Sequence, residues 1–484
     1  MKSKKESVFR QFPRTFWVAN TMELFERWAW YGFYMVLALY LTGSTDTGAL
    51  GFTQEQKGNL MGPVTFMLYL LPIVTGAIAD RFGYKKVLLI AYVILSSGYF
   101  LLGQVHSYAG FYILFVYLAI GAALFKPIIT ATISRTTNDR TSSIGFGIFY
   151  MIVNIGAFIG PVFASKLRVL DWQFVFYLSS AIICLNFILV LFFFREPPVV
   201  RSQKPFLASV KTIFSNVVIV LADIRLVVFL LIIVGFWSMY LQLFYTLPVF
   251  IDQWMDTASL YRMISSLSPA LAEAVGTPQG TIAPEMLTNL DALYIVIFQI
   301  MVSGFVMRFT PLRAMTSGIL VSSIGVGLMF AFNNPLYLMI SILIFGLGEM
   351  STSPKTQEYV GKIAPPDKTA LYMGYSYLPL AGGHMVAGIL SGSIYSRIAD
   401  KATLLERELL SKGIELPPVS QDFTLNEFYA RAATELNMDP AGLTLYLWET
   451  YQPHKIWVLF SSIGLATFLA LLLYDKLLMQ RKKV

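Results

Sequence analysis

The stretch GAIADRFGYKK occupies residues 76–86 and joins two apolar stretches, 56–79 and 85–104. Its candidate turn residues are Gly76, Asp80, Arg81 and Gly83. Glycine permits a tight turn and a close approach of helices, and an aspartate can accept from a helix N-terminus. Basic residues favour the cytoplasmic side of a membrane. The stretch therefore predicts a tight cytoplasmic connection between two membrane helices.

Composition supports a polytopic membrane protein. The chain has 484 residues, of which 56% are hydrophobic and 13% charged, against roughly 25% charged residues in soluble domains. One crossing needs about 20 mostly apolar residues. Twelve stretches meet this condition: 15–42, 56–79, 85–104, 108–134, 143–165, 173–194, 224–250, 288–308, 313–332, 336–354, 369–397 and 454–478. We therefore predict an all-α membrane protein with twelve transmembrane helices.

The distribution of charge predicts orientation and excludes other classes of protein. The net charge of +8 comes from basic residues scattered through short loops, so it indicates membrane topology and not nucleic-acid binding. Basic residues gather on one side of the twelve predicted spans, which places both termini in the cytoplasm. The chain has one cysteine, Cys184, so no intramolecular disulfide and no cysteine-type metal site are expected. No phosphate loop or nucleophile–base set is present, so we expect no enzyme.

Three polar segments divide the chain. Residues 195–223 contain Pro197, Pro198 and Pro205 followed by an amphipathic run, and we expect a cytoplasmic linker with a surface helix. It separates an N-terminal six-helix bundle, 1–194, from a C-terminal one, 224–484. Two inserts, 252–287 and 398–452, are predicted to face outward, and the second is expected to form one or two small helices. Lids, docking surfaces and functionless inserts all fit these segments.

The first predicted span carries charge at a depth where charge is costly. Glu23, Glu26 and Arg27 share one helix face because they are three and four residues apart, and Tyr31 and Tyr34 continue this face. Lys126 lies in the fourth span, where the following Pro127 can loosen the backbone. We expect Lys126 and Arg27 to offset the two glutamates as a buried quartet.

Glu349 lies in the tenth span, within GLGEMSTSPK, without a basic residue at similar depth in the second half. Three deep carboxylates then face two permanent cations, and the excess negative charge must be met by a proton or a cationic ligand. This excess of one buried negative charge is what a proton-coupled carrier of an amine-bearing substrate requires. The same count would also arise if one of the three glutamates were exposed to water. His384 is either a proton carrier or, as we favour, a neutral imidazole bonded to a backbone carbonyl beside small residues.

Three motifs resemble the proton-dependent oligopeptide transporter family of the major facilitator superfamily, whose inter-helix loop motif also resembles residues 76–86. ELFERWAWYG (23–32) is similar to the family's ExxERFxYYG pattern, and FYMIVNIG (149–156) to its FYxxINxG signature. Lys126-Pro127, Gly348-Glu349 and Ser353-Pro354 match its fourth- and tenth-helix segments in order. The resemblance implies a major facilitator fold of two six-helix bundles.

The resemblance also implies a function: uptake of di- and tripeptides coupled to inward proton flow, by alternating access. Proton coupling would involve Glu23, Glu26, Arg27 and Lys126, while Glu349 would meet the peptide ammonium and Asn154 the peptide backbone. The candidate substrate-binding residues are Tyr31, Tyr34, Lys126, Tyr150, Asn154, Trp237, Gln242, Glu349 and Ser353. No cofactor is expected besides the coupling proton. The expected partners are a small-molecule substrate and the lipid bilayer, and a monomer in a bacterial inner membrane is expected.

Two positions depart from the family pattern. Tyr34 stands where the family has a second arginine for the peptide carboxylate, and Leu241, in FWSMYLQ (236–242), stands where it has an acidic residue linked to coupling. Relative to the family pattern, the chain lacks one cation and one anion at these positions, so the net charge of the predicted site is unchanged. A less usual peptide, an amino-acid derivative or another amine therefore stays open as substrate, as do a drug or metabolite exporter and a non-transporting sensor.

Overall fold

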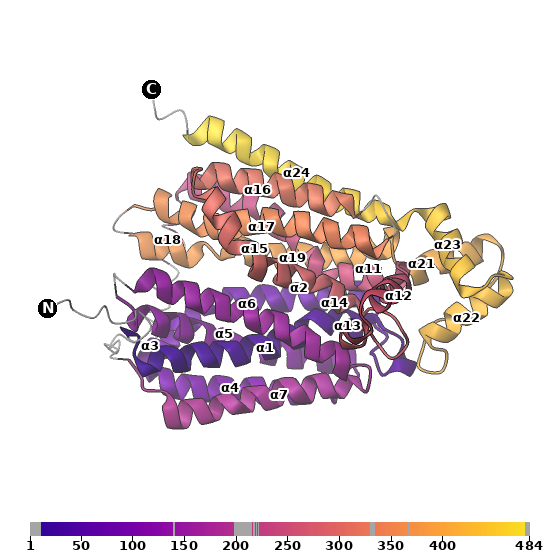
Figure 1. The fold of residues 1–484 in the computed structure, drawn as a ribbon, viewed down its shortest axis with the longest axis horizontal. Helices are drawn as coiled ribbons and strands as arrows, with labels where there is room; N and C mark the ends of the chain where they lie inside the picture. The colour runs from indigo at the N-terminus through magenta and orange to yellow at the C-terminus, as the bar shows by residue number, and fades with distance from the viewer. Residues whose placement is uncertain are drawn as a thin grey trace. The chain divides into compact units, whose positions relative to one another are not determined.

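The structure is a computed structural model that describes residues 11–138, 141–197, 215, 218, 220, 222–329, 334–365 and 368–479. The described residues form helices and no strands (Figure 1). The helices before the linker are α1 (Arg14–Thr42), α2 (Gln54–Leu70), α3 (Pro72–Phe82), α4 (Tyr84–Leu102), α5 (Tyr108–Arg135), α6 (Ser142–Leu167) and α7 (Trp172–Ile188). Most of the predicted linker, 198–214 with 216, 217, 219 and 221, lies outside the described residues.

The second half begins with α9 (Ile224–Tyr240), α10 (Gln242–Tyr245) and α11 (Leu247–Trp254). The long helices that follow are α15 (Leu290–Val306), α16 (Pro311–Leu328), α17 (Pro335–Ile363), α19 (Leu378–Ile389) and α24 (Ile456–Tyr474). The shorter ones are α12 (Thr257–Leu267), α13 (Pro269–Val275), α14 (Pro284–Thr288), α18 (Thr369–Tyr375), α20 (Tyr395–Ile398), α21 (Lys401–Ser411), α22 (Leu425–Glu435) and α23 (Pro440–Tyr451). Each of the twelve predicted apolar stretches therefore contains helix.

Nine helices of the described chain are long and apolar enough to cross a membrane, and the pair α2–α3 adds a tenth if it forms one span bent by 43°. The bend lies at Pro72, which lacks the N–H that would continue the helix. Two predicted spans fail this test. In α1 the three charges at Glu23, Glu26 and Arg27 lower the mean hydropathy, and the eleventh stretch is divided among α18, α19 and α20, with a π-helical turn at Leu390–Ile394.

The insert that follows α20 forms three helices, α21 to α23, and the expectation of one or two is wrong. Each helix has its own N-cap: the side chains of Asp400, Thr424 and Asp439 accept hydrogen bonds from backbone N–H groups of the first turn. At α22, Glu427 also reaches back to the N-cap, which completes a capping box. Three separate start signals thus explain three helices.

The chain divides into two compact units. Unit 1 comprises residues 1–33, 67–168 and 173–219, and unit 2 comprises residues 34–66, 169–172 and 220–484. The boundary cuts α1 after Phe33 and the bent pair before Met67, so the start of α2 belongs to the same unit as α9 to α24. The predicted division into six-helix bundles at 194 and 224 stays a prediction.

Candidate functional site

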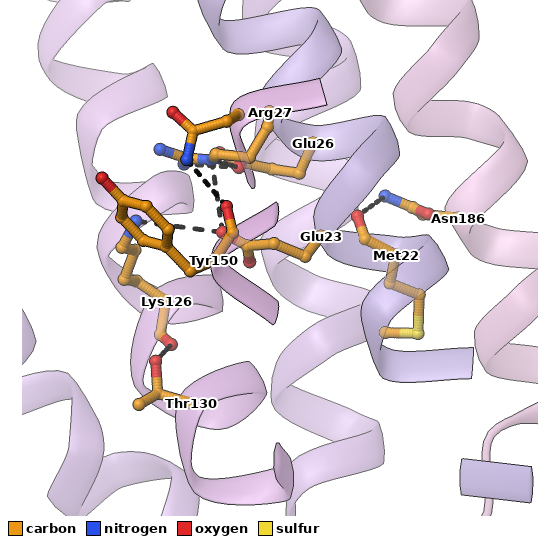
Figure 2. A network of polar contacts seen from close by, with 9 residues as sticks. Met22, Glu23, Glu26, Arg27, Lys126, Thr130, Tyr150 and Asn186 are labelled. Carbon is orange, nitrogen blue, oxygen red and sulfur yellow. Dashed lines mark hydrogen bonds and ion pairs between the residues drawn. The ribbon is translucent and has the colours of Figure 1, made fainter. Parts of the chain in front are cut away.

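The predicted quartet comes together in unit 1 (Figure 2). The Arg27 guanidinium bridges two carboxylates of its own helix: Nε lies 3.4 Å from Glu23 Oε1, and Nη2 pairs with Glu26. Lys126 Nζ of α5 lies 3.9 Å from the same Glu23 oxygen. The exposed fractions of Glu23, Glu26 and Arg27 are 1%, 0% and 5%, whereas the Lys126 side chain is 34% exposed. Two cations thus neutralise two anions, and Lys126 is the member open to solvent.

Pro127 shapes the helix that carries Lys126. Proline has no N–H to give to the carbonyl four residues earlier, which is that of Ala123. The Thr75 hydroxyl of α3 donates to this carbonyl at 2.6 Å. A side-chain hydrogen bond from a neighbouring helix thus replaces the missing backbone bond, and it ties α3 to α5 one turn before the lysine.

Helix α6 approaches α1 through glycine. A Cβ on Gly156 would lie 2.7 Å from the Cβ of Arg27, and one on Gly160 would lie 2.5 Å from the backbone nitrogen of Gly32. Such distances require a residue without a side chain. The GxxxG spacing within FYMIVNIGAFIG therefore holds α6 against the face of α1 next to the arginine.

The two α6 candidates, Tyr150 and Asn154, lie one turn apart. Tyr150 is 41% exposed and is drawn in the polar network of Figure 2. Asn154 Nδ2 donates to the Tyr150 carbonyl at 2.8 Å. The Tyr31 ring centroid lies 5.9 Å from the Arg27 guanidinium carbon.

A small cavity opens between α1, α2, α3 and α5, next to the two cations. It is lined by Arg27, Trp30, Leu68, Tyr69, Pro72, Ala122 and Lys126. A cavity with aromatic and apolar walls and two cationic groups suits an anionic group such as a carboxylate.

In unit 2, Glu349 of α17 is 6% exposed. Its Oε1 accepts from the Ser353 hydroxyl one turn later at 3.3 Å, and within the described chain its Oε2 accepts no hydrogen bond. The structure therefore joins two predicted residues, Glu349 and Ser353. It places no cation of the described chain within 4.0 Å of the carboxylate.

The remaining substrate candidates have partners inside unit 2. Gln242 is 1% exposed; its Nε2 donates to the Ser238 carbonyl at 2.9 Å and its Oε1 accepts from the Thr246 hydroxyl at 2.6 Å. The half-buried Trp237 packs against the rings of Phe236 and Tyr240.

Tyr34 and His384 belong to one aromatic group in unit 2. Tyr34 is 3% exposed, with its hydroxyl 3.4 Å from Thr65 Oγ1 and its ring packed on Tyr245 and His384. His384 Nδ1 lies 3.0 Å from the Tyr245 hydroxyl. The described partner of the imidazole is thus a tyrosine hydroxyl, where we expected a backbone carbonyl.

The loop motif forms the predicted turn, with a different set of hydrogen bonds. Gly83 has φ +91°, a conformation that favours glycine, and it lies between α3 and α4. The N-terminal N–H of α4, at Tyr84, donates to Glu196 at 2.6 Å, whereas Asp80 accepts from the Tyr84 hydroxyl at 3.2 Å. The expectation that Asp80 accepts from the helix N-terminus is wrong, because Glu196, distant in sequence, takes that position.

The buried charged residues that the sequence analysis did not single out include Asp291 and Lys57. Asp291, in the first turn of α15, is 4% exposed. Lys57, in the first turn of α2, is fully buried, and its Nζ donates to Gln54 Oε1 at 2.8 Å and to the Tyr245 carbonyl at 2.9 Å. Gln54 Nε2 in turn donates to Asp400 at 3.1 Å. Both residues lie near the ends of predicted spans, where charged side chains commonly contact water. The sequence therefore gave no indication that these two are buried.

The model of the Major Facilitator Superfamily matches residues 21–276, just over half of the chain. The chain therefore belongs to the major facilitator superfamily. The predicted all-α major facilitator fold is confirmed, and the protein is an integral membrane transporter and not an enzyme.

Proteins with similar sequences include transporters that are named for different substrates. The chain is 22% identical over 447 residues to "Uncharacterized transporter YclF" of Bacillus subtilis, covering 81% of this chain and 90% of that protein. It is 23% identical to "Multidrug resistance protein MdtH" of Aeromonas hydrophila, covering 75% of this chain and 84% of the relative. It is 31% identical to "Dipeptide and tripeptide permease B" of Salmonella typhimurium over 166 residues, 32% of each chain.

Solved structures share the fold. A POT family transporter in complex with 5-aminolevulinic acid has a TM-score of 0.69 and 18% identity, covering 97% of this chain and 99% of that one. The peptide transporter POT in complex with sulfate has the same TM-score at 16% identity, covering 96% and 94%. The predicted resemblance to peptide transporters is thereby confirmed.

Proposed function

We propose that the protein is a proton-coupled symporter of short peptides or peptide-like amines that works by alternating access. The observation that carries this proposal is the distribution of buried charge. Unit 1 holds a neutral quartet with the partly exposed Lys126, and unit 2 holds Glu349, which pairs with no cation among the described residues. A zwitterionic substrate has a carboxylate that suits the cations around the unit 1 cavity and an ammonium that suits Glu349.

The family names of relatives support this assignment. The permease relative is named for dipeptides and tripeptides, and a POT family transporter of the same fold was solved in complex with 5-aminolevulinic acid, an amine-bearing acid. With Tyr34 and Leu241 in place of two charged residues of the family pattern, the proposed substrate class extends from dipeptides and tripeptides to single amine-bearing acids.

Coupling follows from the electrostatics of the quartet. Protonation of Glu23 or Glu26 would remove one partner of Arg27 or Lys126 and free a cation for the substrate carboxylate. Substrate binding and proton binding would then favour each other, as symport requires.

Uptake into proteoliposomes tests the proposal. Purified protein receives an inward proton gradient and a negative interior, with labelled dipeptides, tripeptides, 5-aminolevulinic acid and single amino acids offered outside. We expect accumulation above the outside concentration, lost in Lys126→Ala and retained in Lys86→Ala, which removes an exposed lysine of α4. If folded wild-type protein accumulates none of these compounds, the proposal fails.

Export of drugs is the second candidate, because the MdtH relative covers 75% of this chain against 32% for the permease. Inverted vesicles with an acidic interior distinguish the two. Proton-driven loading of a cationic dye into such vesicles, without peptide uptake in the first assay, would favour the exporter.

We also propose a monomer in the bacterial inner membrane with both termini in the cytoplasm, on the basis of the basic loops and the bacterial relatives. A fluorescent protein fused to the C-terminus, which matures only in the cytoplasm, tests the orientation. Light scattering of the detergent-solubilised protein tests the oligomeric state.

A further inference from the structure

A second buried carboxylate lies close to Glu349. Helices α15 and α17 pack together, with Asp291 in the first turn of α15 and Glu349 near the middle of α17. A Cβ on Gly346 of α17 would lie 2.8 Å from Asp291 Oδ1. Residues three apart share a helix face, so the Asp291 carboxylate is directed at α17 within one turn of Glu349.

Within the described chain, neither carboxylate is paired with a cation. The residues are 4% and 6% exposed, and no basic nitrogen of the described chain lies within 4.0 Å of either. Among described groups, Asp291 Oδ1 and Glu349 Oε2 accept no hydrogen bond. The charged neighbour that acts on Glu349 is Asp291, and its effect is repulsive.

The described parts of the helices packed against this pair place no basic group in an ion pair with either carboxylate. α14 contributes another acid, Glu285, and α16 an exposed arginine, Arg313, in its first turn. On α17 itself, Lys355 and Lys362 lie one to four turns further on and pair with Glu358 at 2.5 and 2.8 Å. On α12, Arg262 is 71% exposed and lies 3.8 Å from Asp256. The described part of α18 carries no charged residue.

Two carboxylates this close in a medium of low dielectric constant cannot both stay ionised without a counter-charge. One proton shared between them leaves a single negative charge, and one ammonium then neutralises the site. With Glu349 alone, a proton and an ammonium would compete for the same carboxylate. A second carboxylate lets both bind at once.

We propose that Asp291 and Glu349 form one site that takes up a coupling proton and a substrate ammonium in the same transport cycle, with Asp291 as the proton carrier. This inference rests on the proposed symport of an amine-bearing substrate. Each carboxylate has one oxygen, Asp291 Oδ1 or Glu349 Oε2, that accepts no hydrogen bond among the described groups. The Ser353 hydroxyl donates to Glu349 Oε1 and stabilises the charged form of this carboxylate, and on this difference we assign the proton to Asp291. Asp291 thereby supplies in α15 the acid that Leu241, 3% exposed, does not supply in span 7.

Transport assays separate the two roles. In proteoliposomes with the dipeptide or amine that wild-type protein accumulates best, Asp291→Asn should lose uphill accumulation about tenfold or more, yet keep exchange of labelled for unlabelled substrate within about twofold. Asp291→Glu should restore accumulation, and Glu349→Gln should lose accumulation and exchange alike. Glu435→Gln, which removes an exposed carboxylate of α22 paired with Arg431, is the matched control.

Chemical labelling tests the proton without any substrate. Dicyclohexylcarbodiimide reacts with protonated carboxyl groups in apolar surroundings, so peptide mass spectrometry at pH 7 should find the adduct on Asp291 of the wild-type protein. Absence of the adduct, or uphill accumulation by Asp291→Asn equal to wild type, overturns the inference. Loss of exchange by Asp291→Asn as complete as in Glu349→Gln also overturns it, since Asp291 would then bind the ammonium. Labelled Asp291 in a protein that transports no peptide would leave the inference on proton binding standing and refute the peptide function alone.

Discussion

The two units differ in how their buried carboxylates are compensated. In unit 1, Glu23 and Glu26 are buried with Arg27 between them, and Lys126 approaches from α5. In unit 2, Asp291 and Glu349 are equally buried and have no described cation. The cluster in unit 1 has no net charge without a ligand, whereas the acidic pair in unit 2 needs a proton or a cation to balance its charge. Unit 1 is therefore electrically balanced before a ligand binds, whereas the charge of unit 2 is balanced only by a proton or a ligand.

Removing the central cation of unit 1 should have the largest effect on stability. Arg27→Ala leaves two carboxylates buried without their partner, and breaking such a pair costs about 3–5 kcal/mol. Thermal unfolding in detergent measures the loss, with Arg81→Ala, which removes an exposed arginine in the last turn of α3, as the control. An Arg27→Ala protein as stable as Arg81→Ala would mean that water already compensates the quartet.

Crowding the arginine should have the next largest effect. The Cβ of Gly156→Ala would lie 2.7 Å from the Arg27 Cβ, and overpacking of this kind costs about 1–3 kcal/mol. Gly147→Ala on the same helix adds a Cβ with nothing within 4 Å, and should be neutral or slightly stabilising. The difference between the two melting temperatures is the measurement. Equal values would show that α6 does not position Arg27.

Neutralising the acid of unit 2 should change stability in the opposite direction. Glu349→Gln removes the single buried negative charge of the acidic pair and should raise the free energy of unfolding by about 1 kcal/mol at neutral pH. The same variant should lose binding of the amine substrate, as measured by isothermal calorimetry. A destabilised Glu349→Gln protein would indicate a cation partner for Glu349, and the contrast between the units would disappear.

Removing the solvent-exposed cation should have the smallest effect on stability. Lys126 is 34% exposed and 3.9 Å from Glu23, so Lys126→Ala should cost less than about 1 kcal/mol. Proton-driven uptake by this variant should nevertheless be abolished. A stability loss as large as that of Arg27→Ala would mean that Lys126 is an essential part of the buried cluster and not a group held ready for substrate.

The quartet was predictable because its geometry is mostly local. Three of its members lie within five residues of one helix, where spacings of three and four fix the shared face. Lys126 was predictable from its depth in an apolar stretch, since an isolated charge there must find partners. The partner of the Ala123 carbonyl was not predictable, because Thr75 lies 48 residues away in the sequence.

The site in unit 2 was predictable only in part. Glu349 and Ser353 are one turn apart, and their hydrogen bond follows from helix geometry. The role of Asp80 was predicted wrongly because Glu196, more than 100 residues later, occupies the N-terminus of α4. The three helices of the insert 398–452 are each explained by an N-cap residue visible in the sequence, yet their number was underestimated.

Hydropathy and helical periodicity depend on residues close together in the chain, so the membrane-spanning helical class, the superfamily motifs and the charged face of α1 were predictable from the sequence. The position of Asp291 near Glu349, and the burial of Lys57 between Gln54 and the Tyr245 carbonyl, depend on the packing of helices that are distant in the sequence. Both are charged residues near the ends of apolar stretches, where the sequence permits either contact with water or burial. Whether such a residue contacts water or is buried depends on which helix, distant in the sequence, packs against it. Only a buried charge of this kind is a candidate for a functional role.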